Sequence, residues 1–123
     1  MSNEIVNLTT YPALVGAVMR HLREQKGISQ LATANYLGVT QPSYSRLESG
    51  RAVLSVAQLS RVCGFLGLSP SEFLQKVDFA KATMKKMGVR VEHDQAPDMG
   101  KVIVNVLMGA ALVLLISKVL ARD

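Results

Sequence analysis

The residues best suited to binding chemistry lie between positions 38 and 51, in the stretch "GVTQPSYSRLESGR". This stretch contains a threonine, a glutamine, three serines, a tyrosine and two arginines. Its polar residues outnumber its apolar ones, so it contributes little to a hydrophobic core. Amide, hydroxyl and guanidinium groups at helical spacing form a hydrogen-bonding face, and we expect a partner molecule to recognise that face.

The overall charge of the chain indicates the class of that partner. Among the 123 residues, 14 lysines and arginines outnumber nine aspartates and glutamates, which gives a formal net charge of +5. An excess of positive charge favours a polyanion, either nucleic acid or an anionic membrane surface. Charge alone does not choose between these two partners.

The sequence contains no constellation typical of an enzyme. No carboxylate pair, no nucleophile beside a base and no glycine-rich phosphate loop can be assembled, and the serines fall at caps and turns. Cys63 is the only cysteine, which excludes an internal disulfide and a multi-thiolate metal site. His21 and His93 lack partners at metal-ligand spacing, and we expect both at the surface. We therefore predict a non-enzymatic protein without a cofactor.

Five helices that position the polar stretch are predicted from caps, helix breakers and apolar spacing. They cover residues 12–26, 29–37, 40–49, 55–66 and 69–87, with Ser29, Thr40, Ser55 and Ser69 as N-caps. No convincing strand pair precedes residue 88, so the predicted fold class is all-α. Within the third helix, Tyr44 and Leu47 are expected to face inward. This leaves four polar residues on or beside the outer face: Gln41, Ser43, Ser45 and Arg46.

The predicted domain organisation has four parts. Residues 1–10 form an N-terminal arm, 11–87 a compact helical domain, 88–100 a linker with a short extended piece at "VRVEH", and 101–123 a C-terminal hydrophobic helix. Only "GVT" separates the second helix from the third, and such a short joint is typical of a helix-turn-helix unit.

These motifs resemble the phage-repressor and Cro-like helix-turn-helix family. The resemblance covers residues 14–76 and rests on "LREQKGISQ", "YLGVTQPSYSRLESGR" and "LSPSEFL", which follow the family's order and spacing. It departs from the family at Thr33, where relatives carry a large aliphatic residue before the alanine. It implies a five-helix lambda-repressor-like domain that binds double-stranded DNA as a homodimer, with the helix at 41–49 in the major groove.

The resemblance also implies roles for individual residues. Base-contacting positions are Gln41, Pro42, Ser43, Ser45 and Arg46, with the Gln41 amide suited to adenine and the Arg46 guanidinium to guanine. Phosphate-contacting positions are Gln30, Ser49 and Arg51. Arg23 and Glu48 match a structural ion pair that ties the first helix to the end of the recognition helix.

The C-terminal segment has a different composition. Residues 102–117, "VIVNVLMGAALVLLIS", contain no charged side chain, and only Asn105 and Ser117 are polar. A helix over these residues is roughly 24 Å long, and extension to Leu120 approaches the ~30 Å hydrocarbon thickness of a bilayer. We therefore predict insertion into a membrane over 102–120, with burial of this helix in a dimer as the alternative.

Together these observations predict a DNA-binding regulator, expected to be a repressor at a two-fold operator, with a cytoplasmic DNA-binding domain tethered to the inner membrane. The first alternative is a soluble cytoplasmic repressor or antitoxin whose apolar tail mediates oligomerisation or partner binding. The second is a membrane scaffold whose helix-turn-helix domain contacts protein.

Overall fold

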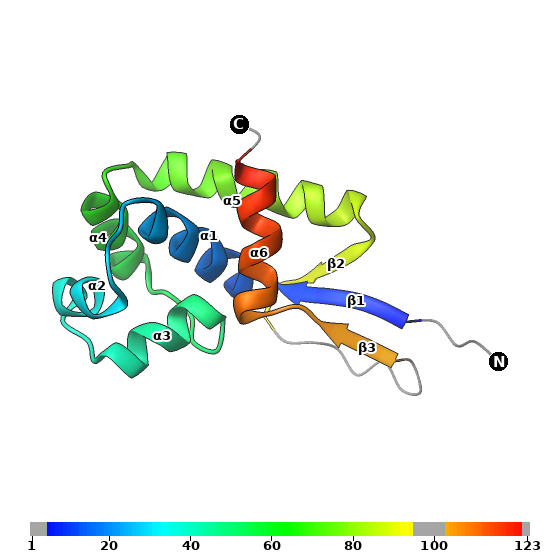
Figure 1. Ribbon diagram of the computed structural model, residues 1–123, viewed down its shortest axis with the longest axis horizontal. Coiled ribbons are helices and arrows are strands. Elements are labelled where there is room, and N and C mark those ends of the chain that lie inside the picture. The colour runs from blue at the N-terminus through cyan, green and yellow to red at the C-terminus, as the bar shows by residue number, and fades with distance from the viewer. Residues whose placement is uncertain (1–4, 95–102, 122–123) are drawn as a thin grey trace.

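The structure, a computed structural model, describes residues 5–94 and 103–121 and contains six helices and three strands in those residues (Figure 1). In chain order, these elements are β1 (Ile5–Thr10), α1 (Tyr11–Gln25), α2 (Gln30–Leu37), α3 (Gln41–Ser49), α4 (Val56–Leu66), α5 (Pro70–Lys86), β2 (Val89–Glu92), β3 (Ile103–Val106) and α6 (Gly109–Leu120).

The five helices predicted from local signals are confirmed. All four predicted N-cap side chains accept a hydrogen bond from a backbone amide in the first turn of their helix: Ser29, Thr40, Ser55 and Ser69. The caps at Ser55 and Ser69 are complete capping boxes, because Gln58 and Glu72 return a side-chain bond to the cap backbone. These polar groups satisfy backbone amides that a helix leaves unpaired, and they fix where each helix begins.

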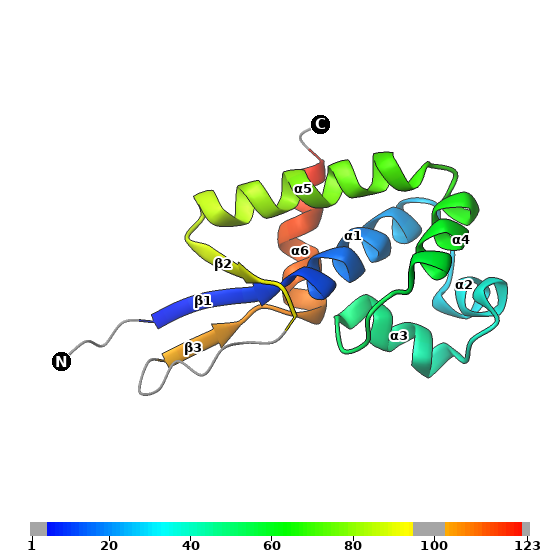
Figure 2. The same ribbon diagram turned by 180° about the vertical axis from the view of Figure 1, so that it is seen from behind.

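Helix α1 lies at the centre of the molecule and contacts α3, α5, α6 and β1. Figures 1 and 2 show α5 along one edge of the molecule, α3 along the opposite edge and α6 crossing one face of α1 and α5. The largest fully buried side chains come from several of these elements and include Leu14, Tyr44, Phe73 and Ile116. One apolar core therefore holds both α3 and the C-terminal helix α6.

The prediction of an all-α class is wrong, because three segments form a parallel sheet in the order β2-β1-β3. Asn7 of β1 pairs with Val89 of β2 and with Asn105 of β3. The pairing continues beyond β3, where the Leu107 amide donates to the Leu8 carbonyl at 2.7 Å and the Thr9 hydroxyl donates to the Leu107 carbonyl at 2.6 Å. The fold is mostly helical, with this small sheet attached to the start of α1.

The sheet uses parts of the predicted arm, linker and tail. Strand β1 occupies the described part of the predicted arm at 1–10, and β2 coincides with the short extended piece predicted within 88–100. The rest of that linker, over 95–100, lies outside the described residues. The paired strands are distant in the sequence and parallel. They are therefore not joined by a hairpin turn, which is the local sequence signal that would have predicted their pairing.

The prediction of one hydrophobic helix over 101–123 is also wrong. Ile103–Val106 is the strand β3, and the helix α6 begins only at Gly109. Three of the four residues in β3 are β-branched, whereas α6 is rich in alanine and leucine, and this difference in propensity divides the run. Among residues 5–94 and 103–121, no helix is both long enough and apolar enough to cross a membrane, so the predicted span over 102–120 is not supported.

The apolar side of α6 packs against its own chain. Leu112, Val113, Ile116 and Val119 are buried in the common core. At the edge of this contact, His21 Nδ1 and Ser117 Oγ lie 3.0 Å apart in a hydrogen bond between α1 and α6. The prediction that His21 lies at the surface is therefore wrong, since its side chain is covered by the tail, whereas His93 is exposed as expected.

Candidate nucleic-acid interface

The turn between α2 and α3 sets the start of the candidate recognition helix. Helix α2 ends at Gly38, and Thr40 caps α3 by accepting the Ser43 amide at 3.2 Å. The Thr40 hydroxyl donates its proton to Ser43 Oγ at 2.9 Å, which leaves the Ser43 hydroxyl proton available for another acceptor. The cap therefore presents a polar group outward at the first turn of α3.

Helix α3 has one buried face and one exposed face. Tyr44, Leu47 and Glu48 are buried, and the first two were predicted to face inward. The predicted base-contacting residues Gln41, Pro42, Ser43 and Arg46 are exposed, and Ser45 is half-buried at the boundary. The structure therefore places four of these five residues on the exposed side of the helix and the fifth at its boundary.

The buried side of α3 approaches the backbone of α1 closely. A Cβ atom at Gly16 of α1 would overlap the carbonyl oxygens of Leu47 and Glu48. At the end of α3, Gly50 adopts a φ of +80°, and a Cβ atom there would overlap Ala13. Glycine at both positions permits this contact, and at Gly50 it also permits the left-handed conformation that ends the helix.

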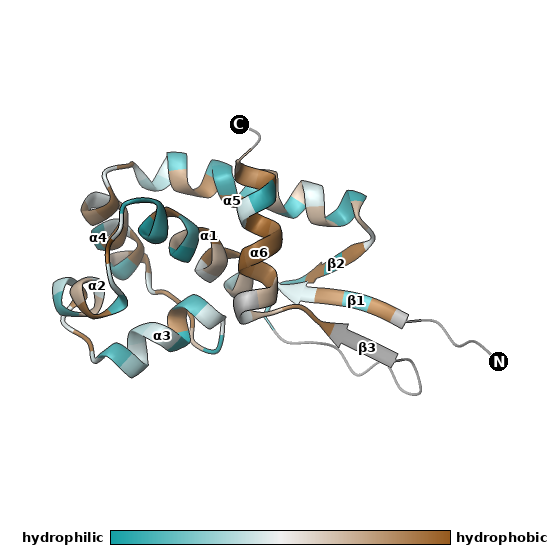
Figure 3. Ribbon diagram, in the orientation of Figure 1, coloured by the Kyte–Doolittle hydropathy of each residue, from teal (hydrophilic) through white to brown (hydrophobic). Residues whose placement is uncertain are grey.

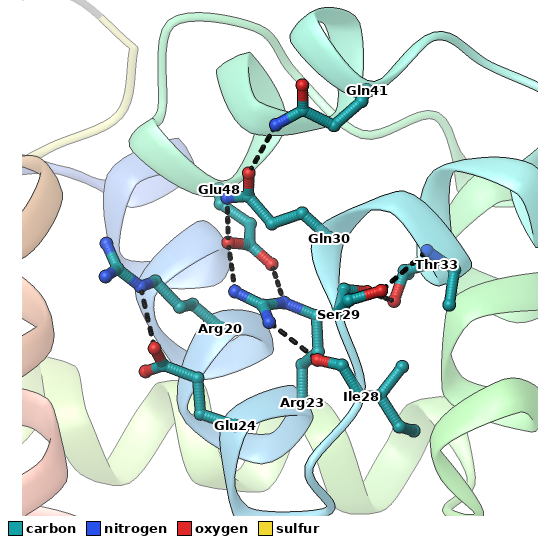
Figure 4. Close-up of polar contacts among 10 residues, drawn as sticks. Arg20, Arg23, Glu24, Ile28, Ser29, Gln30, Thr33, Gln41 and Glu48 are labelled. Carbon is teal, nitrogen blue, oxygen red and sulfur yellow. Dashed lines mark hydrogen bonds and ion pairs between the residues drawn. The ribbon is translucent and has the colours of Figure 1, made fainter.

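A buried ion pair fixes the end of α3 to α1 (Figure 4). The Arg23 guanidinium donates from Nε to Glu48 Oε2 at 2.6 Å and from Nη2 to Glu48 Oε1 at 3.0 Å. Arg23 Nη1 donates to the Ile28 carbonyl at 2.7 Å, so the same side chain also holds the loop before α2. The hydrogen bonds to Glu48 raise the pKa of Arg23, and burial together with the Glu48 charge raises the pKa of Tyr44.

A chain of amide hydrogen bonds extends from this ion pair to the exposed face (Figure 4). Gln30 Nε2 donates to Glu48 Oε1 at 2.9 Å, and Gln41 Nε2 donates to Gln30 Oε1 at 2.9 Å. An ionised carboxylate only accepts hydrogen bonds, so the amide nitrogen of Gln30 must face Glu48 and its oxygen must face Gln41. The buried charge of Glu48 therefore decides which way the exposed Gln41 amide points.

The Gln41 amide keeps two hydrogen-bonding groups for a ligand. One of its two N–H groups is used by Gln30, which leaves one N–H donor and the carbonyl oxygen. Both groups lie in the plane of the same amide. Their pattern, one donor beside one acceptor, is complementary to the edge of a base that presents one acceptor beside one donor.

The predicted phosphate-contacting residues flank this face in different ways. Arg51 follows the helix and is exposed, and Gln30 is half-buried beside Gln41 with one N–H left after its bond to Glu48. The Ser49 hydroxyl already donates to the Arg46 carbonyl at 3.2 Å, so it has only its oxygen lone pairs left to offer. Arg51 and Gln30 are therefore better placed than Ser49 to donate to a phosphate.

The sequence did not identify the close approach at Gly16. This residue lies inside a predicted helix, where glycine is unfavourable by about 0.5–1 kcal/mol relative to alanine. An interior glycine of this kind often marks close backbone packing, so the sequence does contain a signal for this contact.

Comparison with known proteins places the interface within a recognised class of domain. Residues 19–73 match the helix-turn-helix family model, and this range contains α2, α3 and α4. The chain is 33% identical over 63 residues to a prophage-derived, uncharacterised HTH-type transcriptional regulator, YonR, of Bacillus subtilis (strain 168). That similarity covers 51% of this chain and 57% of the relative, so the chain spans little more than half the length of the curated relative.

Two crystal structures of the clp gene regulator ClgR from Corynebacterium glutamicum have a similar fold. The first has a TM-score of 0.60 and 28% identity, and the match covers 63% of this chain and 82% of that chain. The second has a TM-score of 0.53 and 31% identity, with coverage of 55% and 88%. Most of each ClgR chain therefore has a counterpart here, whereas each match leaves a considerable part of this chain uncovered.

Proposed function

Residues 19–73 form a helix-turn-helix domain, and from this premise we propose that the protein is a sequence-specific DNA-binding transcription regulator. The observation that carries the proposal is the outward face of α3, where Gln41 and Arg46 are exposed while the helix itself is fixed to α1 by buried contacts. A helix that is rigidly held and polar on its outer side suits the major groove of DNA, whose width accepts one helix.

Each exposed group has a base or phosphate that suits its chemistry. The free N–H and oxygen of Gln41 match N7 and N6 of adenine, and the Arg46 guanidinium matches O6 and N7 of guanine. Pro42 has no side-chain donor and contacts a thymine methyl, and Ser43 and Ser45 bind a base edge or a phosphate. The phosphate contacts proposed for Gln30, Ser49 and Arg51 fix the register of the helix on DNA without reading sequence.

The regulator is proposed to act as a homodimer on a two-fold operator. One recognition helix reads only a few base pairs, and two copies related by a two-fold axis double the length of the site that is read. Occupancy of such a site next to a promoter represses transcription by excluding other proteins. This part of the proposal rests on the similarity to HTH-type regulators and on the charge of the chain.

Two arginine variants test the proposal on DNA fragments selected by the wild-type protein. Arg46→Ala is expected to lose about 1–3 kcal/mol of discrimination between the selected site and its variants, because it removes a bidentate base contact. Arg51→Ala is expected to weaken all sequences alike and to lower the slope of log affinity against log salt by about one. Both quantities come from equilibrium binding at several salt concentrations.

The same titrations distinguish DNA binding from protein binding. If the domain contacts another protein and not DNA, its affinity for DNA will depend little on salt. It will also show no sequence preference, so Arg46→Ala will have no discrimination to reduce. Identical behaviour of the two arginine variants would refute the division between base-reading and phosphate-binding residues.

A further inference from the structure

Helices α5 and α6 form an apolar groove that the DNA-binding proposal does not use. The groove has a volume of about 480 Å³, and its principal lining residues are four apolar side chains and two lysines: Phe79, Met87, Leu115, Val119, Lys86 and Lys118. Helix α5 runs along the edge of the molecule opposite α3 (Figures 1 and 2). The groove therefore stays accessible when α3 faces DNA.

Two of the apolar side chains that line the groove, and one that lies beside it, are exposed. Phe79 is 44% exposed, Met87 is 50% exposed, and Leu114 on the outer side of α6 is 68% exposed. Leu114 lies one helical turn before Lys118, which lines the groove, so Leu114 is on the same side of α6 as that lysine. Figure 3 shows that α6 is hydrophobic along most of its length. Exposed apolar side chains gathered around a groove are typical of an interaction site.

Positive charge borders the same surface. Within residues 5–94 and 103–121, neither Lys86 nor Lys118 has an ion-pair partner. The described residues that line the groove include no carboxylate. A partner that covers this groove is therefore favoured if its apolar side chains are flanked by negative charge.

We propose that the α5–α6 groove binds an acidic amphipathic helix of a partner protein. Two helices that cross leave a hollow that accepts the side-chain ridge of a third helix, and leucine-type side chains fill such a hollow. Glutamates on the flanks of that helix then pair with Lys86 and Lys118. A flat lipid surface fits less well, because the apolar atoms line a hollow between helices and do not form one protruding face.

This inference goes beyond the proposed function and does not depend on it. It gives the molecule a second surface, built from α5 and from a helix outside residues 19–73. Because the groove and α3 lie at opposite edges, one molecule can hold DNA and the partner helix at the same time.

The test uses a labelled peptide of roughly 18 residues with leucines on one helical face and glutamates elsewhere. Two further peptides serve as controls, one with the same composition in scrambled order and one with lysine in place of each glutamate. The full chain is titrated as wild type, as Phe79→Ser, and as the double variant Lys86→Glu with Lys118→Glu. The matched charge control is Lys26→Glu with Lys85→Glu, which changes two exposed lysines that do not line the groove.

We expect the glutamate peptide to bind wild type, and the scrambled peptide to bind at least about tenfold more weakly. Phe79→Ser and the groove double variant should each weaken binding by about tenfold or more, whereas the matched charge control should keep it within about twofold. The lysine peptide should bind the groove double variant better than it binds wild type. Thermal unfolding of every variant checks that the fold is kept.

Binding of an acidic peptide to the DNA-reading face is excluded by repeating the titration with DNA bound. Unchanged peptide affinity in the presence of saturating DNA supports the groove, and displacement of the peptide by DNA overturns the proposal. The proposal is also overturned if vesicles with anionic lipid bind while the peptide does not. Self-association that Phe79→Ser abolishes, without any peptide binding, would assign the groove to a second copy of the chain instead.

Discussion

Helices α3 and α6 both pack against α1, but different forces hold them. Helix α3 is anchored by a buried ion pair to Arg23 and by backbone contact at Gly16, and its N-terminus is capped by Thr40. Helix α6 has no side-chain N-cap and buries aliphatic side chains such as Leu112 and Ile116. Directional polar contacts fix the rotation and register of α3, whereas apolar burial stabilises α6 without fixing its orientation as strictly.

The difference corresponds to the roles that we propose for the two helices. A base-reading helix needs its amide and guanidinium groups held in a defined geometry, and the hydrogen bonds that run from Arg23 through Glu48 and Gln30 to Gln41 supply it. A helix that covers α1 and supports a docking groove needs mainly apolar area. The comparison predicts that polar substitutions will affect α3 most strongly and that cavity-forming substitutions will affect α6 most strongly.

The largest expected effect comes from Glu48→Ala. This change leaves the Arg23 guanidinium buried without its counter-charge and removes the group that orients Gln30, so the free energy of unfolding should fall by about 3–5 kcal/mol. The control is Glu24→Ala, which breaks a partly exposed pair with Arg20 at 3.5 Å and should cost about 0–1 kcal/mol. Denaturant titration measures both. If the two variants lose the same free energy of unfolding, the buried ion pair of Glu48 contributes no more to stability than the partly exposed pair of Glu24.

Ile116→Ala tests the apolar side of the comparison. It creates a cavity under α6 at a fully buried position, and the expected loss of stability is about 2–5 kcal/mol. Leu114→Ala, at a position 68% exposed, should change stability by less than about 0.5 kcal/mol. Hydrogen exchange shows whether the loss reaches α1 and α3. A loss confined to α6 would mean that the two helices do not share one cooperative core.

The two helices also differ in how well they could be predicted from sequence. The start and end of α3 follow from Thr40 and Gly50, whose local backbone preferences decide the boundaries before any packing is known. The apolar run from 102 to 117 has no side-chain N-cap to mark where its helix begins. Because its hydropathy is uniform, the change from strand to helix could not be predicted from it. What divides it is the pairing of β3 with β1, a contact between residues such as Ile5 and Ile103 that are far apart in the sequence.

In the candidate site too, local features could be predicted from the sequence and contacts between helices could not. The outward positions on α3 were predictable from helical spacing and from the resemblance to helix-turn-helix proteins. The bonds that orient Gln41 were not, because they depend on the distance and direction of side chains from three helices. The prediction for His21 was wrong for a related reason, since the segment that contains its partner Ser117 was expected to lie in a membrane.

A smaller effect is expected where α3 meets α1 through glycine. Gly16→Ala places a methyl group against the carbonyl oxygens of Leu47 and Glu48, and the resulting overpacking should cost about 1–3 kcal/mol and shift α3. The matched control is Gly64→Ala in α4, where the added methyl group meets nothing within 4 Å and should stabilise the protein by about 0.5–1 kcal/mol. If Gly16→Ala lowers stability while Gly64→Ala raises it, the loss at Gly16 comes from close packing and not from helix propensity. If both variants gain stability, the backbone contact of α3 has room for a side chain.

The smallest expected effect concerns the hydrogen bond between Ser117 of α6 and His21 of α1. Burial, and secondarily the charge of Lys76, lower the pKa of His21 below its ordinary value of 6.5, whereas the nearby Glu24 opposes this shift. The unfolded chain therefore binds a proton more readily than the folded chain, and stability decreases as the pH falls from 6.5 toward the folded pKa. Denaturant titrations at about pH 7.5 and about pH 5.5 should show this loss in wild type. His21→Gln should reduce the difference between the two pH values and His93→Gln should not, because only His21 is covered by α6. If the two variants show the same pH dependence, α6 does not shield His21 in solution, and the contact with Ser117 contributes nothing to the docking of the tail.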